Sequence, residues 1–130
     1  MKRLLLDTHL VLWWLASDRR LGATARRLIE TSACAVSIVT VAEIAMKAAV
    51  GKLRLPAQPL DEQLEHAGIA ILALTLAHVQ AASRAMGHHA DPFDCLLVGT
   101  ALAEKMAFAT RDRLLLEHAA PLLGKMLVEA

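Results

Sequence analysis

The sequence predicts an α/β fold of three layers, α/β/α, in which helices cover both faces of a mostly parallel central sheet. Short apolar runs of strand length alternate along the chain with segments of helical periodicity. Parallel strands need long crossover connections, which are usually helices that pack on the sheet. A length of 130 residues suits one compact unit. We therefore expect residues 1–130 to form a single domain.

The first half of the chain begins with the run Leu4-Leu5-Leu6, which is ended by Asp7 and is typical of a buried strand. Thr40-Val41-Ala42-Glu43 matches a capping box, and Gly51 suits the position after a helix. The elements expected after the first strand are helices over residues 8–16, 24–31 and 40–49, and a strand over residues 33–37.

The second half begins with a connector marked by Pro56 and Pro59. Asp91-Pro92 is a strong helix start, because Asp91 can cap the helix and proline suits its first position. Asp112 suits the start of a last helix that ends near His118. The other expected elements are helices over residues 60–67, 76–86 and 92–103, and strands over residues 69–73, 107–109 and 125–128.

Composition and charge limit the classes of function. Apolar residues make up 56% of the chain, with few aromatics, which favours a helix-rich interior and some apolar surface that self-association would cover. The net charge of +1 gives no global basic surface, so affinity for nucleic acid must come from local basic residues. The basic residues nearest the acids discussed below are Lys52, Arg54, Arg111 and Arg113, and an ordinary solvated surface is the alternative for each.

The apolar runs do not predict a membrane protein. The stretch over residues 4–16 contains Asp7 and His9, so it suits neither a membrane span nor the apolar part of a secretory signal. Cys34 and Cys95 are too few and too far apart for a disulfide framework or a zinc motif. We expect buried thiols and a cytoplasmic protein.

Four acidic residues fall at places that share one edge of such a sheet. Asp7 ends the first strand and Asp112 follows the strand candidate at 107–109. Glu43 and Asp94 are placed in the first turn of predicted helices. Strand carboxyl ends and the following helix starts form the ligand edge of a parallel sheet. The alternative is that Glu43, Asp94, Asp112 and also Asp91 serve as helix caps. Asp7 fits that alternative least well, because a charge directly after a buried strand has no obvious partner.

Convergence of these carboxylates predicts a divalent cation site. Two carboxylates about 4 Å apart repel each other by about 4 kcal/mol at an effective dielectric of about 20. A bound cation would hold them ionised, and ligation by oxygen alone favours Mg²⁺ or Mn²⁺ over zinc. Such a site suits phosphodiester hydrolysis, because metal ions supply the nucleophile and stabilise the attacking and leaving oxygens.

Polar neighbours of the acids are candidate accessory residues. Thr8 and Thr110 could orient carboxylates or waters, with ordinary capping as the alternative, and the same holds for Ser37 and Thr40. His88 and His89 precede Asp91, and we interpret this pair as polar surface rather than as a metal site.

Several segments of the chain together resemble a known family. They are Leu4-Leu5-Leu6-Asp7-Thr8-His9, Glu43-Ile44-Ala45-Met46-Lys47, Gly51-Lys52-Leu53-Arg54-Leu55-Pro56, His88-His89-Ala90-Asp91-Pro92-Phe93-Asp94 and Thr110-Arg111-Asp112. In this order and spacing they resemble the PIN domain, in the branch of bacterial VapC-type toxins, over nearly the whole chain. Each motif alone is weak, and the specificity lies in their combination.

The resemblance implies a Mg²⁺- or Mn²⁺-dependent endoribonuclease that forms a homodimer and is inhibited by a small cognate antitoxin covering the site. By the same resemblance Asp7, Glu43 and Asp94 are the core metal ligands and catalytic residues, with Asp112 as the fourth acid. Asp91 is expected to act as a helix cap first and as a ligand second. The chain departs from the family's pattern at Cys95, where a basic residue is usual, and at Ala42, where a bulky aromatic is frequent.

Two other functions remain open. A phosphotransferase using Asp7 as its nucleophile is disfavoured, because Thr8-His9 follows without a second nearby aspartate. A catalytically weak module that retains only antitoxin or RNA binding is disfavoured because all four acids are present.

Overall fold

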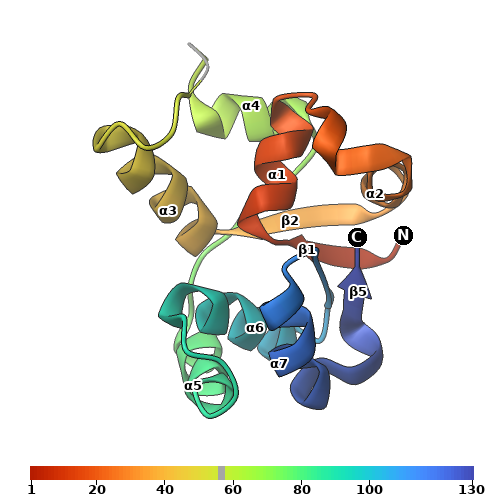
Figure 1. Ribbon diagram of the computed structural model, residues 1–130, viewed down its shortest axis with the longest axis vertical. Coiled ribbons are helices and arrows are strands. Elements are labelled where there is room, and N and C mark those ends of the chain that lie inside the picture. The colour runs from red at the N-terminus through yellow and green to blue at the C-terminus, as the bar shows by residue number, and fades with distance from the viewer. Residues whose placement is uncertain (56–57) are drawn as a thin grey trace.

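The computed structural model describes residues 1–55 and 58–130, and this part of the chain forms a five-stranded parallel sheet (Figure 1). The strands are β1 (Arg3–Leu6), β2 (Ala33–Ser37), β3 (Ala70–Leu72), β4 (Ala107–Thr110) and β5 (Leu127–Glu129). Their spatial order is β3-β2-β1-β4-β5, so β1 lies at the centre. The predicted α/β fold is confirmed. The predicted connector residue Pro56 lies outside the described residues.

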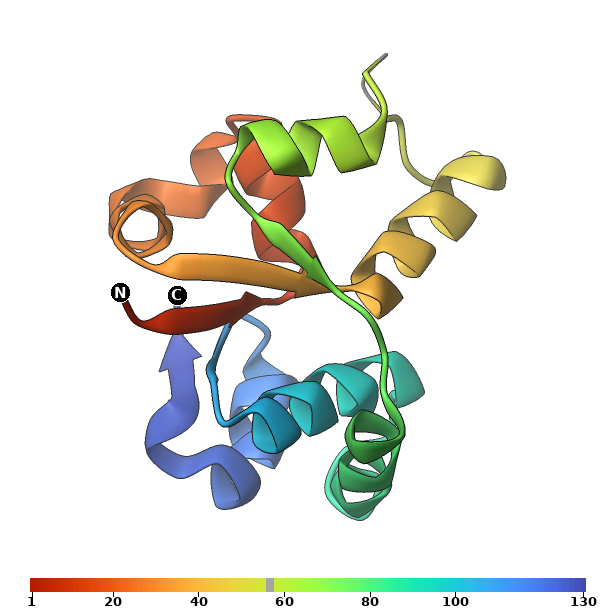
Figure 2. The same cartoon turned by 180° about the vertical axis from the view of Figure 1, so that it is seen from behind.

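Helices cover both faces of this sheet. They are α1 (Thr8–Leu15), α2 (Gly22–Glu30), α3 (Ile38–Ala49), α4 (Leu60–His66), α5 (Leu76–Ala85), α6 (Pro92–Glu104) and α7 (Arg113–Leu123), with short 3₁₀ turns η1 (Arg19–Leu21) and η2 (Gly124–Met126). Figure 1 and the view from behind in Figure 2 place α1, α2 and α4 on one side of the sheet and α5, α6 and α7 on the other. None of the described helices has both the length and the apolar character needed to cross a bilayer.

The central strand divides its side chains between two apolar cores. Leu4 and Leu6 belong to the core under α1, α2 and α4, whereas Leu5 belongs to the core under α5, α6 and α7. All three side chains are fully buried. This explains the unbroken leucine run, because a strand covered on both faces has no polar side to alternate with.

The helices α5 and α6 cross at a glycine. A Cβ at Gly99 would lie 2.4 Å from the amide nitrogen of Ala82 and 2.6 Å from the carbonyl oxygen of His78. Glycine inside a helix lowers helix propensity by about 1 kcal/mol relative to alanine. Here the close approach of the two backbones requires it, and the contact fixes α6 on α5.

The predicted capping box at Thr40 is wrong. Helix α3 begins at Ile38, and the Ser37 hydroxyl accepts a hydrogen bond of 3.0 Å from the Val39 amide. Serine at the end of a strand already has the extended backbone that an N-cap requires, so the helix starts two residues earlier than predicted. Glu43 therefore lies in the second turn of α3, where its side chain is free of a capping role.

Other boundaries also differ from the predictions. Helix α2 begins at Gly22 rather than at residue 24, and α7 continues past His118 to Leu123, with Pro121 in its last turn. Strand β3 lacks Ile69, whose amide donates to the Leu64 carbonyl at the end of α4. Lys125 lies in η2, so the last strand begins at Leu127.

Candidate active site

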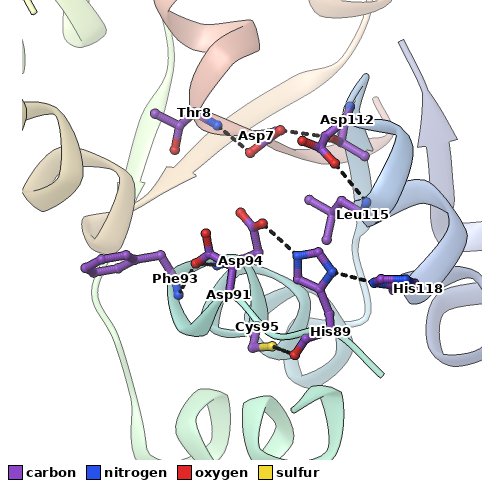
Figure 3. A network of polar contacts seen from close by, with 11 residues as sticks. Asp7, Thr8, His89, Asp91, Phe93, Asp94, Cys95, Asp112, Leu115 and His118 are labelled. Carbon is purple, nitrogen blue, oxygen red and sulfur yellow. Dashed lines mark hydrogen bonds and ion pairs between the residues drawn. The ribbon is translucent and has the colours of Figure 1, made fainter. Parts of the chain in front are cut away.

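The predicted acidic residues gather at the carboxyl edge of the sheet. Strands β1 and β4 are parallel neighbours, with Leu6 paired to Ala109. Asp7 follows β1 and Asp112 follows β4, so both lie at the same edge. Asp94 comes from the first turn of α6, and Figure 3 shows its carboxylate directed toward Asp7.

Asp7 is held in place by neighbours on both sides of it. Its carboxylate accepts hydrogen bonds from the Thr8 amide (2.8 Å) and from the Thr110 hydroxyl (2.7 Å). Its own amide donates to the Ala109 carbonyl at 3.0 Å. The side chain is buried, and this burial raises the pKa of Asp7 above its ordinary value. The two hydrogen bonds oppose that increase, whereas the charge of Asp112 adds to it.

Thr110 links Asp7 to Asp112. The Thr110 hydroxyl donates to Asp7 and accepts a hydrogen bond of 3.1 Å from the Asp112 amide. The exposed Asp112 carboxylate caps α7 by accepting from the Leu115 amide at 2.9 Å. The capping role considered for Asp112 is thus observed, and its role as a fourth metal ligand stays a prediction.

Glu43 reaches the site through Thr8. The Thr8 hydroxyl donates to one Glu43 carboxylate oxygen at 2.9 Å and lies 3.1 Å from the Thr40 hydroxyl. A hydroxyl has one proton and two lone pairs, so Thr8 can donate to Glu43 and accept from Thr40 at once. The other Glu43 oxygen accepts from Lys47 at 2.9 Å. Thr8 therefore connects the helix that follows Asp7 to the acid on α3.

Asp94 is held by a histidine that the sequence interpretation assigned to the surface. The Asp94 carboxylate lies 2.8 Å from His89 Nε2, so the interpretation of His89 as polar surface is wrong, whereas His88 is exposed as expected. Burial raises the pKa of Asp94 to about 6, the His89 hydrogen bond lowers it, and the charges of Asp91 and Asp7 raise it. The Asp91 carboxylate accepts from the amides of Phe93 (2.9 Å) and Asp94 (3.3 Å), which confirms its predicted role as a helix cap.

The donor set has the chemistry of a site for a hard cation, but the side chains are not arranged as a complete coordination shell. Asp7, Glu43, Asp94 and Asp112 offer carboxylate oxygens from one edge, the donors that Mg²⁺ and Mn²⁺ prefer. Asp7 and Asp94 are near enough for the charge of one to raise the pKa of the other. Within residues 1–55 and 58–130, however, no three His, Cys, Asp or Glu side chains form a group that could hold a metal ion. A cation would have to draw the carboxylates closer together.

The basic residues near the site have separate roles. Arg111 donates hydrogen bonds to the carbonyl of Ala130 at 2.9 Å and to the carbonyls of Arg20 and Leu21. Its role is therefore structural, because it holds these backbone segments together. Lys52 and Arg54 instead line a groove of about 580 Å³ beside Thr8. Its other lining includes Lys47, Arg20, Leu12, Trp13, Ile44 and Leu60. The groove thus combines an apolar floor with basic side chains next to the acidic edge.

Comparison with known sequences adds to this geometry. Residues 4–121 match the sequence model of the family described as the PIN domain. The chain is 30% identical over 125 residues to Ribonuclease VapC22 of Mycobacterium tuberculosis, a match that covers 93% of this chain and 95% of that protein.

Solved structures share the fold at low sequence identity. A toxin–antitoxin complex from Klebsiella pneumoniae aligns with a TM-score of 0.65 at 14% identity, covering 95% of this chain and 94% of that one. DNA-bound VapBC from Salmonella typhimurium aligns with a TM-score of 0.65 at 13% identity, covering 99% of this chain and 98% of that one.

Proposed function

Because the chain belongs to the PIN-domain family, in its VapC branch, we propose that it is a metal-dependent endoribonuclease and the toxin of a toxin–antitoxin pair. The observation that carries the proposal is the placement of Asp7. It is a buried carboxylate at the end of the central strand, within electrostatic reach of Asp94 and Asp112. Burial and neighbouring acids disfavour the ionised form of such a carboxylate, and a bound cation would favour it.

In this proposal Asp7, Glu43 and Asp94 hold Mg²⁺ or Mn²⁺, and Asp112 completes the set. A cation bound there supplies the Lewis acid that phosphodiester hydrolysis needs. Asp91 fixes the start of α6 and thereby the position of Asp94.

The remaining residues would prepare the carboxylates and bind the substrate. Thr8 and Thr110 each donate a hydrogen bond to a carboxylate oxygen, which orients that carboxylate. Lys52 and Arg54 lie in the groove beside Thr8, where they would bind phosphates of a single-stranded or looped RNA. The apolar floor of the same groove would exclude water from the contact.

The partners in this proposal are a small antitoxin and a second copy of the chain, and the site of action is the cytoplasm. The named assemblies among the structural neighbours, a toxin–antitoxin complex and VapBC, support the antitoxin. Exposed apolar side chains such as Met46 and Val50 on and after α3 support self-association. Light scattering of the purified protein would test the dimer.

The test of the activity is cleavage of a looped RNA by purified protein with Mg²⁺, with Mn²⁺ and with chelator. We expect cleavage only with metal, and a loss of at least about a thousandfold in Asp7→Asn without loss of folding. Glu30→Gln is the matched control, because it removes an exposed acid on α2 away from the edge. Equal activity of Asp7→Asn and the parent, with contaminating nuclease excluded, would discard the mechanism. Antitoxin or RNA binding without cleavage would favour the binding module instead.

A further inference from the structure

A pair of histidines connects Asp94 to helix α7. His89 lies in the segment between α5 and α6, and Figure 3 shows its ring between the Asp94 carboxylate and the ring of His118. The distance from His89 Nε2 to Asp94 Oδ2 is 2.8 Å, and the distance between the two Nδ1 atoms is 2.8 Å. The His89 side chain is 9% exposed, so water competes little for these bonds.

With an ionised Asp94 and two neutral rings, the two contacts assign the proton to one nitrogen of each ring. A carboxylate oxygen only accepts, so His89 Nε2 must carry a hydrogen. In a neutral ring the other nitrogen of His89 is then an acceptor, and Nδ1 of His118 must donate to it. One tautomer of each ring satisfies both contacts. The hydrogen bonds therefore run in one direction, from His118 through His89 to Asp94.

The backbone around His89 is also anchored. Its amide donates to the Ala85 carbonyl at the end of α5, at 2.9 Å. Its carbonyl accepts from the thiol of Cys95, at 3.2 Å. Cys95 stands where similar proteins usually carry a basic residue, and its short buried side chain here packs beneath the loop. The loop is thus bonded to the helices on either side of it, and its histidine is not free to swing away.

We propose that His89 and His118 are positioning residues for Asp94, with His118 fixing the tautomer of His89 and His89 holding one Asp94 oxygen so that the other faces Asp7. The inference rests on the proposed function, because it gives Asp94 the role of a metal ligand. Ligands of metal sites are commonly oriented by such outer hydrogen bonds, and losing one typically lowers metal affinity 10- to 100-fold. The pair also joins the helix that carries Asp94 to the helix that Asp112 caps.

The alternative is that the histidine pair only stabilises the packing of α6 against α7. A measurement of metal affinity distinguishes this alternative from the proposal. The variants are His89→Phe, His118→Phe and His89→Gln, whose amide can still donate to Asp94. His88→Phe is the control, since His88 is the exposed neighbour. Mn²⁺ affinity is measured by calorimetry without RNA, together with kcat and KM for cleavage and the unfolding midpoint in chelator.

We expect His89→Phe to bind Mn²⁺ about 10- to 100-fold more weakly, with kcat reduced and KM little changed. His118→Phe should show a smaller loss, His89→Gln should recover most of the affinity, and His88→Phe should match the parent. Parent-like Mn²⁺ affinity in both phenylalanine variants would overturn the inference and leave the proposed function standing. A parent that binds no Mn²⁺ overturns both.

A second measurement does not depend on how the variants fold. Nitrogen NMR of the metal-free parent reports the tautomer of each ring. We expect a proton on Nε2 of His89 and on Nδ1 of His118. A neutral His118 with its proton on Nε2 alone would overturn the proposed direction of the hydrogen bonds.

Discussion

Asp7 and Asp94 face each other across the candidate site but are held in different ways. Asp7 is bound by its own sheet: the Thr8 amide follows it in sequence, and the Thr110 hydroxyl ends the neighbouring strand. Asp94 is bound by a loop histidine, and that histidine is bound by another one from α7. The position of Asp7 therefore follows from the pairing of strands, whereas the position of Asp94 depends on the side chains of two histidines.

This difference divides the site into a half fixed by the fold and a half that single substitutions can adjust. A change at the Asp7 side disturbs the end of a strand ladder and should affect stability. A change at the Asp94 side should mainly affect the orientation or charge of one carboxylate. The four predictions below follow in order of decreasing effect. The first concerns the backbone packing that supports the helix of Asp94, and the other three test that division.

The largest effect is expected where α6, the helix that carries Asp94, packs on α5. Gly99→Ala places a Cβ 2.4 Å from the Ala82 amide nitrogen, so the helices must separate. We expect the free energy of unfolding in urea to fall by about 3 kcal/mol. Gly87→Ala is the control, because its nearest contact would be 3.7 Å. Equal stability of the two variants would mean that this helix crossing is not tight.

The next effect concerns the hydrogen bond that Thr110 donates to Asp7. Thr110→Val keeps the shape of the side chain but leaves one oxygen of the buried Asp7 without its donor. We expect the metal-free protein to lose about 2 kcal/mol of stability, measured by urea unfolding. Thr100→Val serves for comparison, because that buried hydroxyl bonds only to the Leu96 carbonyl within the same helix. A loss no larger than in Thr100→Val would show that Asp7 does not depend on Thr110.

A gain in stability is expected when the charge of Asp94 is removed. Burial and the charges of Asp91 and Asp7 disfavour the ionised Asp94 carboxylate. Asp94→Asn removes that charge and keeps an acceptor for His89. We expect the variant to be more stable than the parent by about 1 to 2 kcal/mol in chelator at neutral pH. An unfolding midpoint below that of the parent would contradict the mutual repulsion of these acids.

The smallest effect is a dependence of stability on pH. The pKa of Asp94 is raised from 3.8 to about 6 in the folded protein, so its charge destabilises the fold above that pH. Protonation relieves the penalty as the pH falls through 6 toward 4. Between pH 7 and pH 5 the metal-free parent should gain about 1 kcal/mol relative to Asp94→Asn. The comparison cancels groups that titrate in both proteins, and parallel pH profiles would contradict it.

Much of the fold could be predicted from the sequence because its signals are local. The unbroken run Leu4-Leu5-Leu6 required a strand covered on both faces, and Asp91-Pro92 marked the start of α6. The capping box at Thr40 failed because Ser37, three residues earlier, is an equally good cap and already follows a strand. A local sequence pattern does not show which of two neighbouring candidate residues will cap a helix.

The site was predictable only in part, for a similar reason. Acids after parallel strands share an edge by topology, which placed Asp7 and Asp112 together. The contact between His89 and His118 joins residues 29 positions apart through helix packing. No sequence pattern around either residue predicts such a contact. The spacing of His89 five residues before Asp94 was the one available signal. The roles of the acids in metal binding and catalysis stay predictions.

Thr8 gives α1 a double attachment to the acidic edge. Its amide is bonded to Asp7 and its hydroxyl to Glu43, so one residue at the first position of the helix touches both acids. Leu12 and Trp13 of the same helix also line the groove that contains Lys52 and Arg54. One helix therefore contributes both to the lining of this groove and, through Thr8, to the hydrogen bonds of two acids.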